Sequence, residues 1–308
     1  MLTRKIPSAI LLVMLALSMI VPFALHVATT SPPITMPRAT LIKLWSVTHQ
    51  AYMAKFVGED YVVVFESHGD VSLDGKYISS WKTAYVYRVD TGELLGTLTP
   101  DTGDNYGDTW EVLSWEPFQA QKVWDRMGFF SADSKRMIEN IKALGTNARV
   151  VDTTSWTTIP IDWGFTDTNG NNFYAVQLDY SGSTLFVGHI SDGTIYVYKY
   201  DPEQGRYVLV FSHQESGNYG RRVQMTLDGK YIVVGGLDYG YLDIWEWNGT
   251  AYTRVVHYQL PDSGGLGGLG ISDPYNVGYV IGGTKNGWVI IAHFNTTTKE
   301  FKVIYQNK

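Results

Sequence analysis

Two histidines, one with a carboxylate close by, are the side chains of this sequence best suited to acid-base or metal chemistry. His68 ends the run VFESH and His213 ends LVFSH, and Glu215 follows His213 by two residues. Because the runs are similar, we expect them at equivalent strand ends of a repeated unit, where His68, His213 and Glu215 could bind a ligand. No partner at metal-ligand spacing accompanies them, so the alternative is that they are solvated loop residues.

Oxygen ligands at alternate positions occur in the segment Asp167-x-Asn169-x-Asn171, as they do in calcium sites. An EF-hand loop would continue with a glycine, where this chain has Asn172, and would end with a glutamate, where it has Leu178. This departure favours a turn rich in Asn and Gly. We therefore expect no cofactor, and calcium at these three residues is the alternative.

Aromatic and acidic residues gather between Asp101 and Lys122. Trp110 and Trp115 could stack on a sugar ring or against a partner protein, although aromatic residues in strands also pack against neighbouring strands. The acidic residues of the run DTGDNYGD in the same segment are a second candidate for calcium binding.

Several other reaction classes lack the residues they need. The chain has no cysteine, which excludes disulfides, thiolate metal sites and cysteine nucleophiles. It has neither the G-x-S-x-G nor the H-E-x-x-H motif. The glycine-rich run from Gly264 to Gly270 precedes a strand pattern and lacks the helix N-terminus of a phosphate-binding loop. The formal net charge of −6 argues against nucleic acid as a partner.

The N-terminus reads as an export signal or a membrane anchor. Arg4 and Lys5 precede residues 6–25, which carry no charge and are long enough to span a bilayer as one hydrophobic helix. Cleavage after residue 28 would leave His26 at the −3 position, where a small residue is expected. Retention as a membrane anchor is therefore a serious alternative to cleavage.

Three segments follow from this reading. Residues 1–28 are the signal peptide or anchor, residues 29–39 are a Pro-rich spacer, and residues 40–308 are the folded domain. The basic residues before the hydrophobic run stay on the cytoplasmic side of a membrane. We therefore expect the domain to be extracytoplasmic, either secreted or anchored.

A period of 47 residues recurs in the second half of the chain. Gly188, Gly235 and Gly282 are each 47 residues apart, and an alternating apolar run follows each of them. Three units in the same register therefore occupy roughly residues 176–308, which is the signature of a repeat architecture.

Each unit reads as four short strands joined by tight turns. The hexapeptide LDGKYI occurs at residues 73–78 and again at 227–232, and its Asp-Gly is a hairpin signal because glycine supplies positive φ at no steric cost. The strand that follows the second copy, YIVV, is apolar at every position, so it must be buried on both faces between neighbouring sheets. Four-stranded antiparallel units of this length predict an all-β fold, a β-propeller.

The number of blades is five or six. The first unit fits the period only with an insertion, which we place at Asp101–Lys122. Strand-like runs in residues 40–67 could form an abbreviated blade before it, which gives six blades, the number we favour. Five blades with extra N-terminal strands is the alternative. A parallel β-helix is disfavoured because its coils are much shorter than 47 residues.

The repeat resembles those of the β-propeller superfamily. The pattern D-G-K-Y-I followed by an aromatic-rich strand looks like the repeat of Trp-Asp-type (WD40-like) and YVTN-type propellers. VYRVDTGELLG, at residues 86–96, is similar to the quinoprotein-like repeat. The resemblance covers about residues 70–308, although the Trp-Asp dipeptide is missing from its expected place. It implies an exported prokaryotic type of propeller and says nothing specific of activity.

A binding or interaction module for a partner protein or surface glycan, without catalysis, is the function we expect. The alternative is a propeller enzyme, either a quinoprotein-like dehydrogenase or a glycan-active hydrolase, with its site at the channel mouth. The sequons at Asn248 and Asn295, also 47 residues apart, are glycosylation candidates at outer turns.

Overall fold

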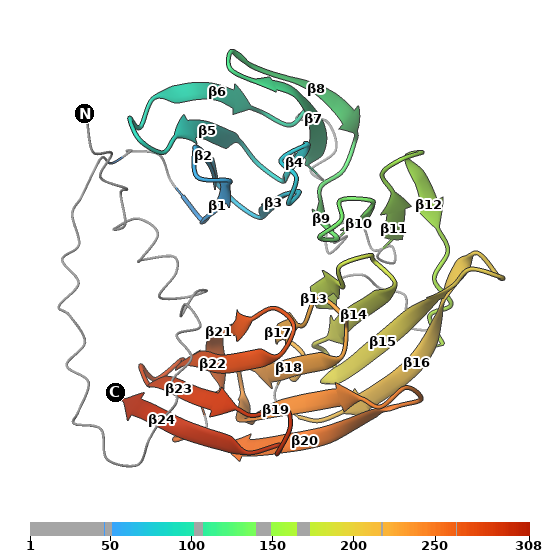
Figure 1. The fold of residues 1–308 in the computed structure, drawn as a ribbon, viewed down its shortest axis with the longest axis vertical. Helices are drawn as coiled ribbons and strands as arrows, with labels where there is room; N and C mark the ends of the chain where they lie inside the picture. Colours follow the sequence, from blue (N-terminus) through green and yellow to red (C-terminus); the bar gives the residue numbers. More distant parts are fainter. Residues whose placement is uncertain are drawn as a thin grey trace.

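Six four-stranded antiparallel sheets, arranged around a central axis, make up the fold (Figure 1). The computed structural model describes Ser46 and residues 51–101, 107–139, 149–164, 173–216, 218–262 and 264–308. Every regular element in these ranges is a β-strand, and none of the described residues belongs to a helix that could cross a membrane. The helix expected at residues 6–25 and the spacer at 29–39 lie outside the described residues.

The last three sheets are each built from four consecutive strands. Gly188, Gly235 and Gly282 all lie in the second strand of their sheets, so the 47-residue period is confirmed as one sheet per repeat. The strands are β13 (Phe173–Leu178), β14 (Thr184–His189), β15 (Thr194–Asp201) and β16 (Arg206–Gln214); β17 (Arg222–Met225), β18 (Tyr231–Gly236), β19 (Tyr239–Trp247) and β20 (Tyr252–Gln259); and β21 (Leu266–Asp273), β22 (Val277–Thr284), β23 (Val289–Phe294) and β24 (Phe301–Asn307).

The third sheet is also consecutive but shorter. Its strands are β9 (Gly128–Phe130), β10 (Arg136–Glu139), β11 (Arg149–Asp152) and β12 (Thr157–Ile159). The order across the sheet follows the chain, with β9 innermost, as in the three sheets after it.

The first two sheets are interleaved. The chain forms β1 (Met53–Val57) and β2 (Tyr61–Phe65) in the first sheet and then passes to the second sheet for β3 (Gly69–Val71) and β4 (Tyr77–Ser80). It returns to the first sheet for β5 (Ala84–Arg88) and β6 (Leu94–Leu98), and it completes the second with β7 (Asp108–Trp115) and β8 (Phe118–Trp124). The sheet orders are therefore β1-β2-β5-β6 and β3-β4-β7-β8 (Figure 1).

This interleaving corrects two expectations. The segment Asp101–Lys122 is not an insertion, because most of it forms the outer strand pair β7–β8 of the second sheet. The first blade is not abbreviated either, since β5 and β6 complete it after the chain has visited its neighbour. Six blades are confirmed. The 47-residue period does not hold in the first two sheets, because each of them is formed from two separate stretches of the chain.

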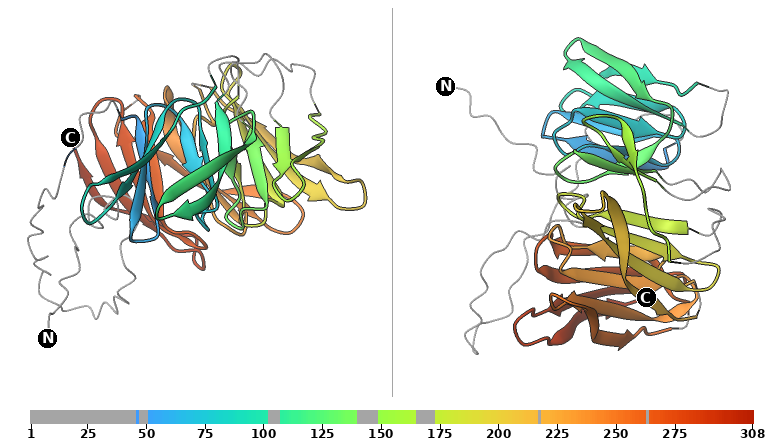
Figure 2. Two further views of the ribbon diagram at one scale, coloured as in Figure 1. Left: turned by 90° about the horizontal axis from the view of Figure 1, so that it is seen from above. Right: turned by 90° about the vertical axis from the view of Figure 1, so that its right-hand side faces the viewer.

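The second strand is buried on both faces in the fourth and fifth sheets, as expected, and is partly buried in the sixth, where it is β22. All six residues of β14 and all six of β18 are buried, because a sheet packs against each of their faces. The apolar clusters of the core fill the spaces between successive sheets; Val233 and Ile244 of the fifth sheet, for example, pack with Leu266 and Val280 of the sixth. Figure 2 shows the sheets stacked side by side in this way.

The repeated hexapeptide forms the same turn in both places. In the first copy the hydroxyl of Ser72 donates to Asp74 Oδ1 at 2.7 Å, and in the second the hydroxyl of Thr226 donates to Asp228 Oδ1 at 2.6 Å. In each copy the glycine has positive φ, as the Asp-Gly signal predicts. LDGKYI is therefore structural, and it marks the turn between the first and second strands of a blade.

Contacts between innermost strands join successive sheets around the ring. β1 contacts β3, β3 contacts β9, β9 contacts β13, β13 contacts β17 and β17 contacts β21. These contacts place the first strands of the sheets around one central channel (Figure 1).

Candidate functional site

A cavity of about 630 Å³ lies on the central axis, and the innermost strands line it. Each of the six sheets contributes: Lys55 comes from β1, Asp70 from β3, Phe130 from β9, Gln177 from β13, Gln224 from β17 and Leu269 from β21. Its volume lies in the range of ordinary ligand pockets, and a concave site lined by apolar groups with a few polar ones is the usual form of such a pocket.

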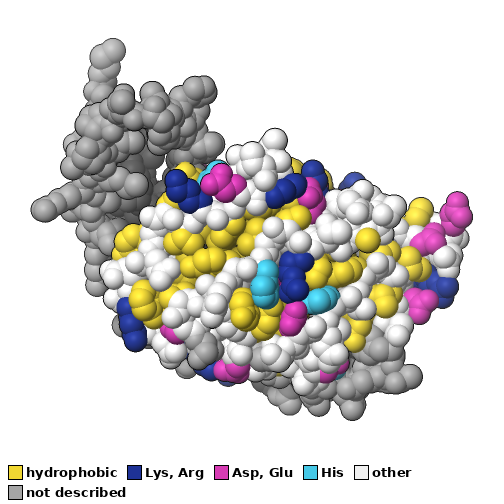
Figure 3. Space-filling model, turned by 90° about the horizontal axis from the view of Figure 1, so that it is seen from below, with side chains coloured by type: hydrophobic (Ala, Val, Ile, Leu, Met, Phe, Trp, Pro, Cys, Tyr) yellow, Lys and Arg dark blue, Asp and Glu magenta, His cyan; other side chains and the backbone are white. Residues whose placement is uncertain are grey.

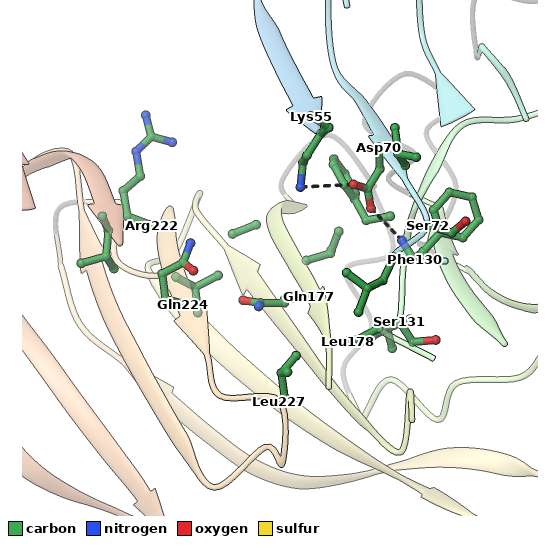
Figure 4. Close-up of a pocket in the computed structure, with 18 of the residues that line it drawn as sticks. Lys55, Asp70, Ser72, Phe130, Ser131, Gln177, Leu178, Arg222, Gln224 and Leu227 are labelled. Carbon is green, nitrogen blue, oxygen red and sulfur yellow. Dashed lines mark hydrogen bonds and ion pairs between the residues drawn. The ribbon is translucent and has the colours of Figure 1, made fainter. Parts of the chain in front are cut away.

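Among the described residues that line this cavity, one has a carboxylate, and that carboxylate is already paired. Asp70 is 7% exposed; its Oδ1 lies 3.2 Å from Lys55 Nζ, and its Oδ2 accepts the backbone N–H of Phe130 at 2.9 Å. Figure 4 shows both interactions along one wall of the cavity. Since burial of an unpaired carboxylate would be costly, the two contacts explain how Asp70 is tolerated at this depth.

Two glutamines face the same space and differ in their partners. The Gln177 amide is fully committed, because its Oε1 accepts the backbone N–H of Met225 at 3.0 Å and its Nε2 donates to the Met225 carbonyl at 3.4 Å. Gln224 is half-buried, and the described hydrogen bonds include none from its side chain. Gln224 therefore offers both a donor and an acceptor to a bound molecule.

The cavity has a charged end and an apolar end. Figure 4 shows Lys55 and Arg222 toward one end, Gln177 and Gln224 in the middle and Leu227 toward the other. Arg222 Nε donates to the carbonyl of Gly267 at 2.7 Å, which fixes the guanidinium at the junction of the fifth and sixth sheets.

A second polar cluster spans the fourth and fifth sheets at their outer strands. His213 Nε2 lies 3.0 Å from Glu215 Oε1, and Arg254 Nη1 donates to the same oxygen at 2.9 Å. Burial alone would raise the pKa of Glu215, but the hydrogen bonds from His213 and Arg254 more than offset it and lower the pKa. His213 also lies against Trp245, with ring centroids 4.6 Å apart.

The buried end of this cluster is Asp243 on β19. Asp243 is fully buried and accepts from His257 Nδ1 at 2.7 Å and from the Tyr239 hydroxyl at 3.0 Å, with Arg254 Nη1 at 3.4 Å. Burial, reinforced by the Asp243 charge, raises the pKa of Tyr239. Figure 3 shows a face of the molecule on which histidine, basic and acidic side chains gather among hydrophobic ones.

The predicted pair His213 and Glu215 is thus brought together, but His68 is not equivalent to His213. His68 follows β2, the second strand of its sheet, and its ring lies 4.8 Å from that of Tyr52. His213 lies in β16, the fourth strand of its sheet. The similar runs VFESH and LVFSH therefore do not mark equivalent strand ends. After β2 the chain leaves the first sheet for the second, whereas LVFSH lies in the last strand of its sheet.

The two tryptophans expected to stack on a ligand both make packing contacts within the protein. Trp110 is 6% exposed and belongs to the core between the first two sheets. Trp115 is half-buried against the same core and stacks on Tyr61, with ring centroids 4.7 Å apart. Both are strand residues of β7 with a packing role, and the binding role expected for them stays a prediction.

The calcium predictions divide. Asp167, Asn169 and Asn171 lie outside the described residues. In the other acidic segment, Lys122 Nζ lies 2.6 Å from Asp101 Oδ2 and 3.1 Å from Asp108 Oδ1. Asp104 lies outside the described residues, and calcium binding at this segment stays a prediction. Within the described ranges, no group of three His, Cys, Asp or Glu side chains could hold a metal ion.

Both sequons lie at turns between the third and fourth strands. Asn248 follows β19 and is exposed, and Asn295 follows β23. Each Oδ1 accepts backbone N–H groups of the turn, from Thr250 and from Thr297, at 2.9 Å in both cases. The predicted topology is confirmed, and glycosylation remains a prediction.

Sequence reasoning missed most residues of both sites. Lys55, Asp70 and Gln224 lie on separate strands, and only the closure of the ring brings them together. Asp243 did give a signal, because an aspartate inside the apolar run YLDIWEW has to find buried partners. Its partner His257 lies directly opposite it on β20.

Comparison with known proteins supports the fold and does not identify the site. No family model matches the chain, and no curated protein matches its sequence. Among solved structures, Hsv2 of Kluyvelomyces marxianus is 9% identical, with a TM-score of 0.55 over 84% of this chain and 85% of its own. The β-propeller domain of Myceliophteria thermophila Cps50 (Swd1) is 10% identical, with a TM-score of 0.50 over 82% and 96%. The periplasmic gluconolactonase PpgL of Pseudomonas aeruginosa is 11% identical, with a TM-score of 0.50 over 81% and 92%. At these identities the likeness concerns architecture alone, and together with the six four-stranded sheets it shows that the chain is a six-bladed β-propeller.

Proposed function

We propose that the protein is an extracytoplasmic binding module whose central cavity recognises a partner protein or surface glycan without catalysing a reaction. The observation that carries this proposal is the composition of the cavity. Its lining combines apolar side chains, a free amide and one carboxylate, Asp70, which is already paired with Lys55. Such a lining provides recognition by shape, hydrogen bonds and charge.

The enzyme alternatives find less support in the described residues. A glycan-active hydrolase needs two carboxyl groups facing each other across the scissile bond, and among the described residues that line the cavity Asp70 is the only carboxylate. A quinoprotein-like dehydrogenase needs an aromatic platform for its cofactor, and the part of the lining that the structure describes contains no tryptophan. The gluconolactonase among the structural neighbours shares the fold at 11% identity, so its activity is a question for assay.

The placement outside the cytoplasm is part of this proposal and derives from the sequence. Arg4 and Lys5 before the uncharged residues 6–25 favour export with the propeller on the outer side. Fractionation of expressing cells with intact-mass measurement of the product tests it. Recovery of the full-length chain from the cytosol would contradict the placement and leave the cavity argument untouched.

Blocking the cavity tests the binding role. Gln224→Trp places a large side chain in the middle of the cavity, and Gln204→Trp, at an exposed turn between β15 and β16, is the matched control. Both proteins are screened against a glycan array and a panel of exported proteins and peptides. We expect a ligand that the wild type and Gln204→Trp bind and Gln224→Trp does not, with thermal stability equal in all three. Hydrolytic turnover of glycosides or lactones that disappears in Asp70→Asn would contradict a purely binding role.

A further inference from the structure

The cavity has cationic side chains toward one end, side-chain amides in the middle and Leu227 toward the other end, and this arrangement points to a ligand chemistry. Lys55 and Arg222 stand toward one end, Gln224 in the middle and Leu227 toward the other (Figure 4). We propose that the cavity binds the C-terminal residues of a partner protein, with the terminal carboxylate at the Lys55 and Arg222 end. The inference rests on the proposed binding role of the same cavity.

Charge is the first argument. The cavity is lined by three cationic side chains, Lys55, Arg221 and Arg222, and by one carboxylate, whereas the chain as a whole has a formal net charge of −6. A concave site of one sign with low-dielectric walls concentrates the opposite charge. Asp70 pairs with Lys55 Nζ and accepts the Phe130 N–H, so three cations against one carboxylate leave an excess of two positive charges in the described lining.

The position of the cations is the second argument. Lys55 is 47% exposed, so its ammonium group is reachable from the cavity while it holds Asp70 at 3.2 Å. The contact of Arg222 Nε with the Gly267 carbonyl anchors the guanidinium at the rim. An anion entering between β1 and β17 therefore meets one cation on each side. Hydrogen bonds between a charged donor and a carboxylate are about twice as strong as neutral ones.

Gln224 favours a peptide over a simple organic acid. Residues 222 and 224 point to the same face of β17, because side chains alternate along a strand. The Gln224 amide, which has no described partner, thus lies just inward of the guanidinium. A side-chain amide offers one donor and one acceptor, which is the complement of a backbone peptide group next to a terminal carboxylate.

The apolar end accommodates the side chain of the last residues. Leu178 and Leu227 line the cavity at the end away from Lys55 and Arg222 (Figure 4). A volume of about 630 Å³ holds a few residues of an extended chain. The matching segment is a C-terminus with an aliphatic residue near its end, since burial of an aliphatic side chain against these leucines removes apolar surface from water.

Two peptides that differ only in terminal charge test this inference on the full chain. The probes are acetyl-Ala-Ala-Leu with a free carboxylate and the same peptide with a C-terminal amide, measured by titration calorimetry. We expect the free acid to bind at least about tenfold more tightly than the amide, because the charge-assisted hydrogen bonds are lost with the charge. Affinity for the free acid should also fall as salt concentration rises.

Variants assign the binding to the cavity. Lys55→Gln should weaken the free acid by about tenfold and leave the amide unchanged, whereas Lys82→Gln, at an exposed site outside the cavity, should change neither. Gln224→Leu should weaken both peptides, since it removes the amide partner and keeps a side chain of similar size. Lys55→Gln also leaves the buried Asp70 without its ion pair, so the double variant Lys55→Gln/Asp70→Asn, which removes both charges, is measured beside it, and thermal melts check that each variant folds.

The remaining outcomes overturn the inference in distinguishable ways. Equal affinity for acid and amide, with loss of both in Gln224→Leu, would refute carboxylate recognition and preserve the proposed binding role. Binding of acetyl-Ala-Glu-Ala-amide in place of the free acid would assign the carboxylate to a side chain, and binding of glucuronate alone would assign it to a glycan. If neither these probes nor the array ligands bind, both the inference and the proposed function fail.

Discussion

Asp243 lies directly opposite His257 in the β19–β20 ladder, and its fully buried carboxylate accepts the His257 Nδ1 hydrogen bond at 2.7 Å. The same carboxylate accepts the Tyr239 hydroxyl, and Arg254 links it to Glu215 beside His213. The outer cluster is therefore one continuous network that joins the fourth sheet to the fifth. The network is fully buried at Asp243 and partly exposed at Glu215, so these two carboxylates give different predictions.

Asp243→Asn should lower the free energy of unfolding by about 3 kcal/mol, because removing one member of a buried charged network leaves its partners without compensation. His257→Gln should cost less, since that side chain is 42% exposed. Chemical denaturation at neutral pH measures both. Asp90→Asn, which removes a surface ion pair with Arg88, is the control. If Asp243→Asn lowers the free energy of unfolding no more than Asp90→Asn does, the charge of Asp243 does not stabilise the fold.

Glu215 predicts a dependence on pH. Its folded-state pKa lies below the ordinary value of 4.5, so its ionisation stabilises the fold fully above that value, and the contribution is lost as the pH falls through the lowered folded pKa. Glu215→Gln should therefore reduce the free energy of unfolding by roughly 1 kcal/mol at neutral pH. The difference from wild type should shrink toward zero below about pH 4.5. A difference that stays constant down to pH 3 would mean that the effect is not ionic.

The interleaved sheets predict shared stability. Ile78 of β4 and Ile232 of β18 occupy the same place in the two copies of LDGKYI, and both are fully buried. Each substitution to Ala should cost about 3 kcal/mol. Ile78→Ala should lower amide-exchange protection equally in β4 and in β2. The chain forms β3 and β4 of the second sheet between β2 and β5 of the first, so the two sheets depend on each other. Ile232→Ala should affect its own sheet most. Unchanged protection in β2 of the Ile78→Ala protein would contradict this coupling.

The sequence pattern predicted the repeat because its signals are local. An Asp-Gly turn followed by a doubly apolar strand requires only neighbouring residues, and it is the same at Asp74 and at Asp228. The exchange of strand pairs between the first two sheets is not local. The Asp-Thr-Gly turn between β5 and β6 reads the same whichever sheet receives the pair, so the pattern could not assign it.

The residues of the candidate sites also differ in whether their contacts are local in the sequence. His213 and Glu215 are two residues apart, so their pairing could be predicted, whereas Arg254 reaches Glu215 from another sheet. The cavity residues are separated further, and their convergence depends on how six sheets close into a ring. Trp110 illustrates the opposite error, since a residue that appeared to lie in an insertion belongs to a core strand.

The turn glycine of the hexapeptide gives the last prediction. Gly229 has φ +67°, and a Cβ there would lie 2.8 Å from Thr184 Oγ1 of the neighbouring sheet. Gly205 has a similar φ of +64° but no atom within 4 Å of the Cβ position, so it is a control for backbone strain alone. Gly205→Ala should cost about 1 kcal/mol, the price of a left-handed conformation for an L-residue. Gly229→Ala should cost more, because Thr184 must also move. Denaturant unfolding of both variants measures the difference in the free energy of unfolding. Equal decreases in the two variants would show that Thr184 moves aside without loss of stability.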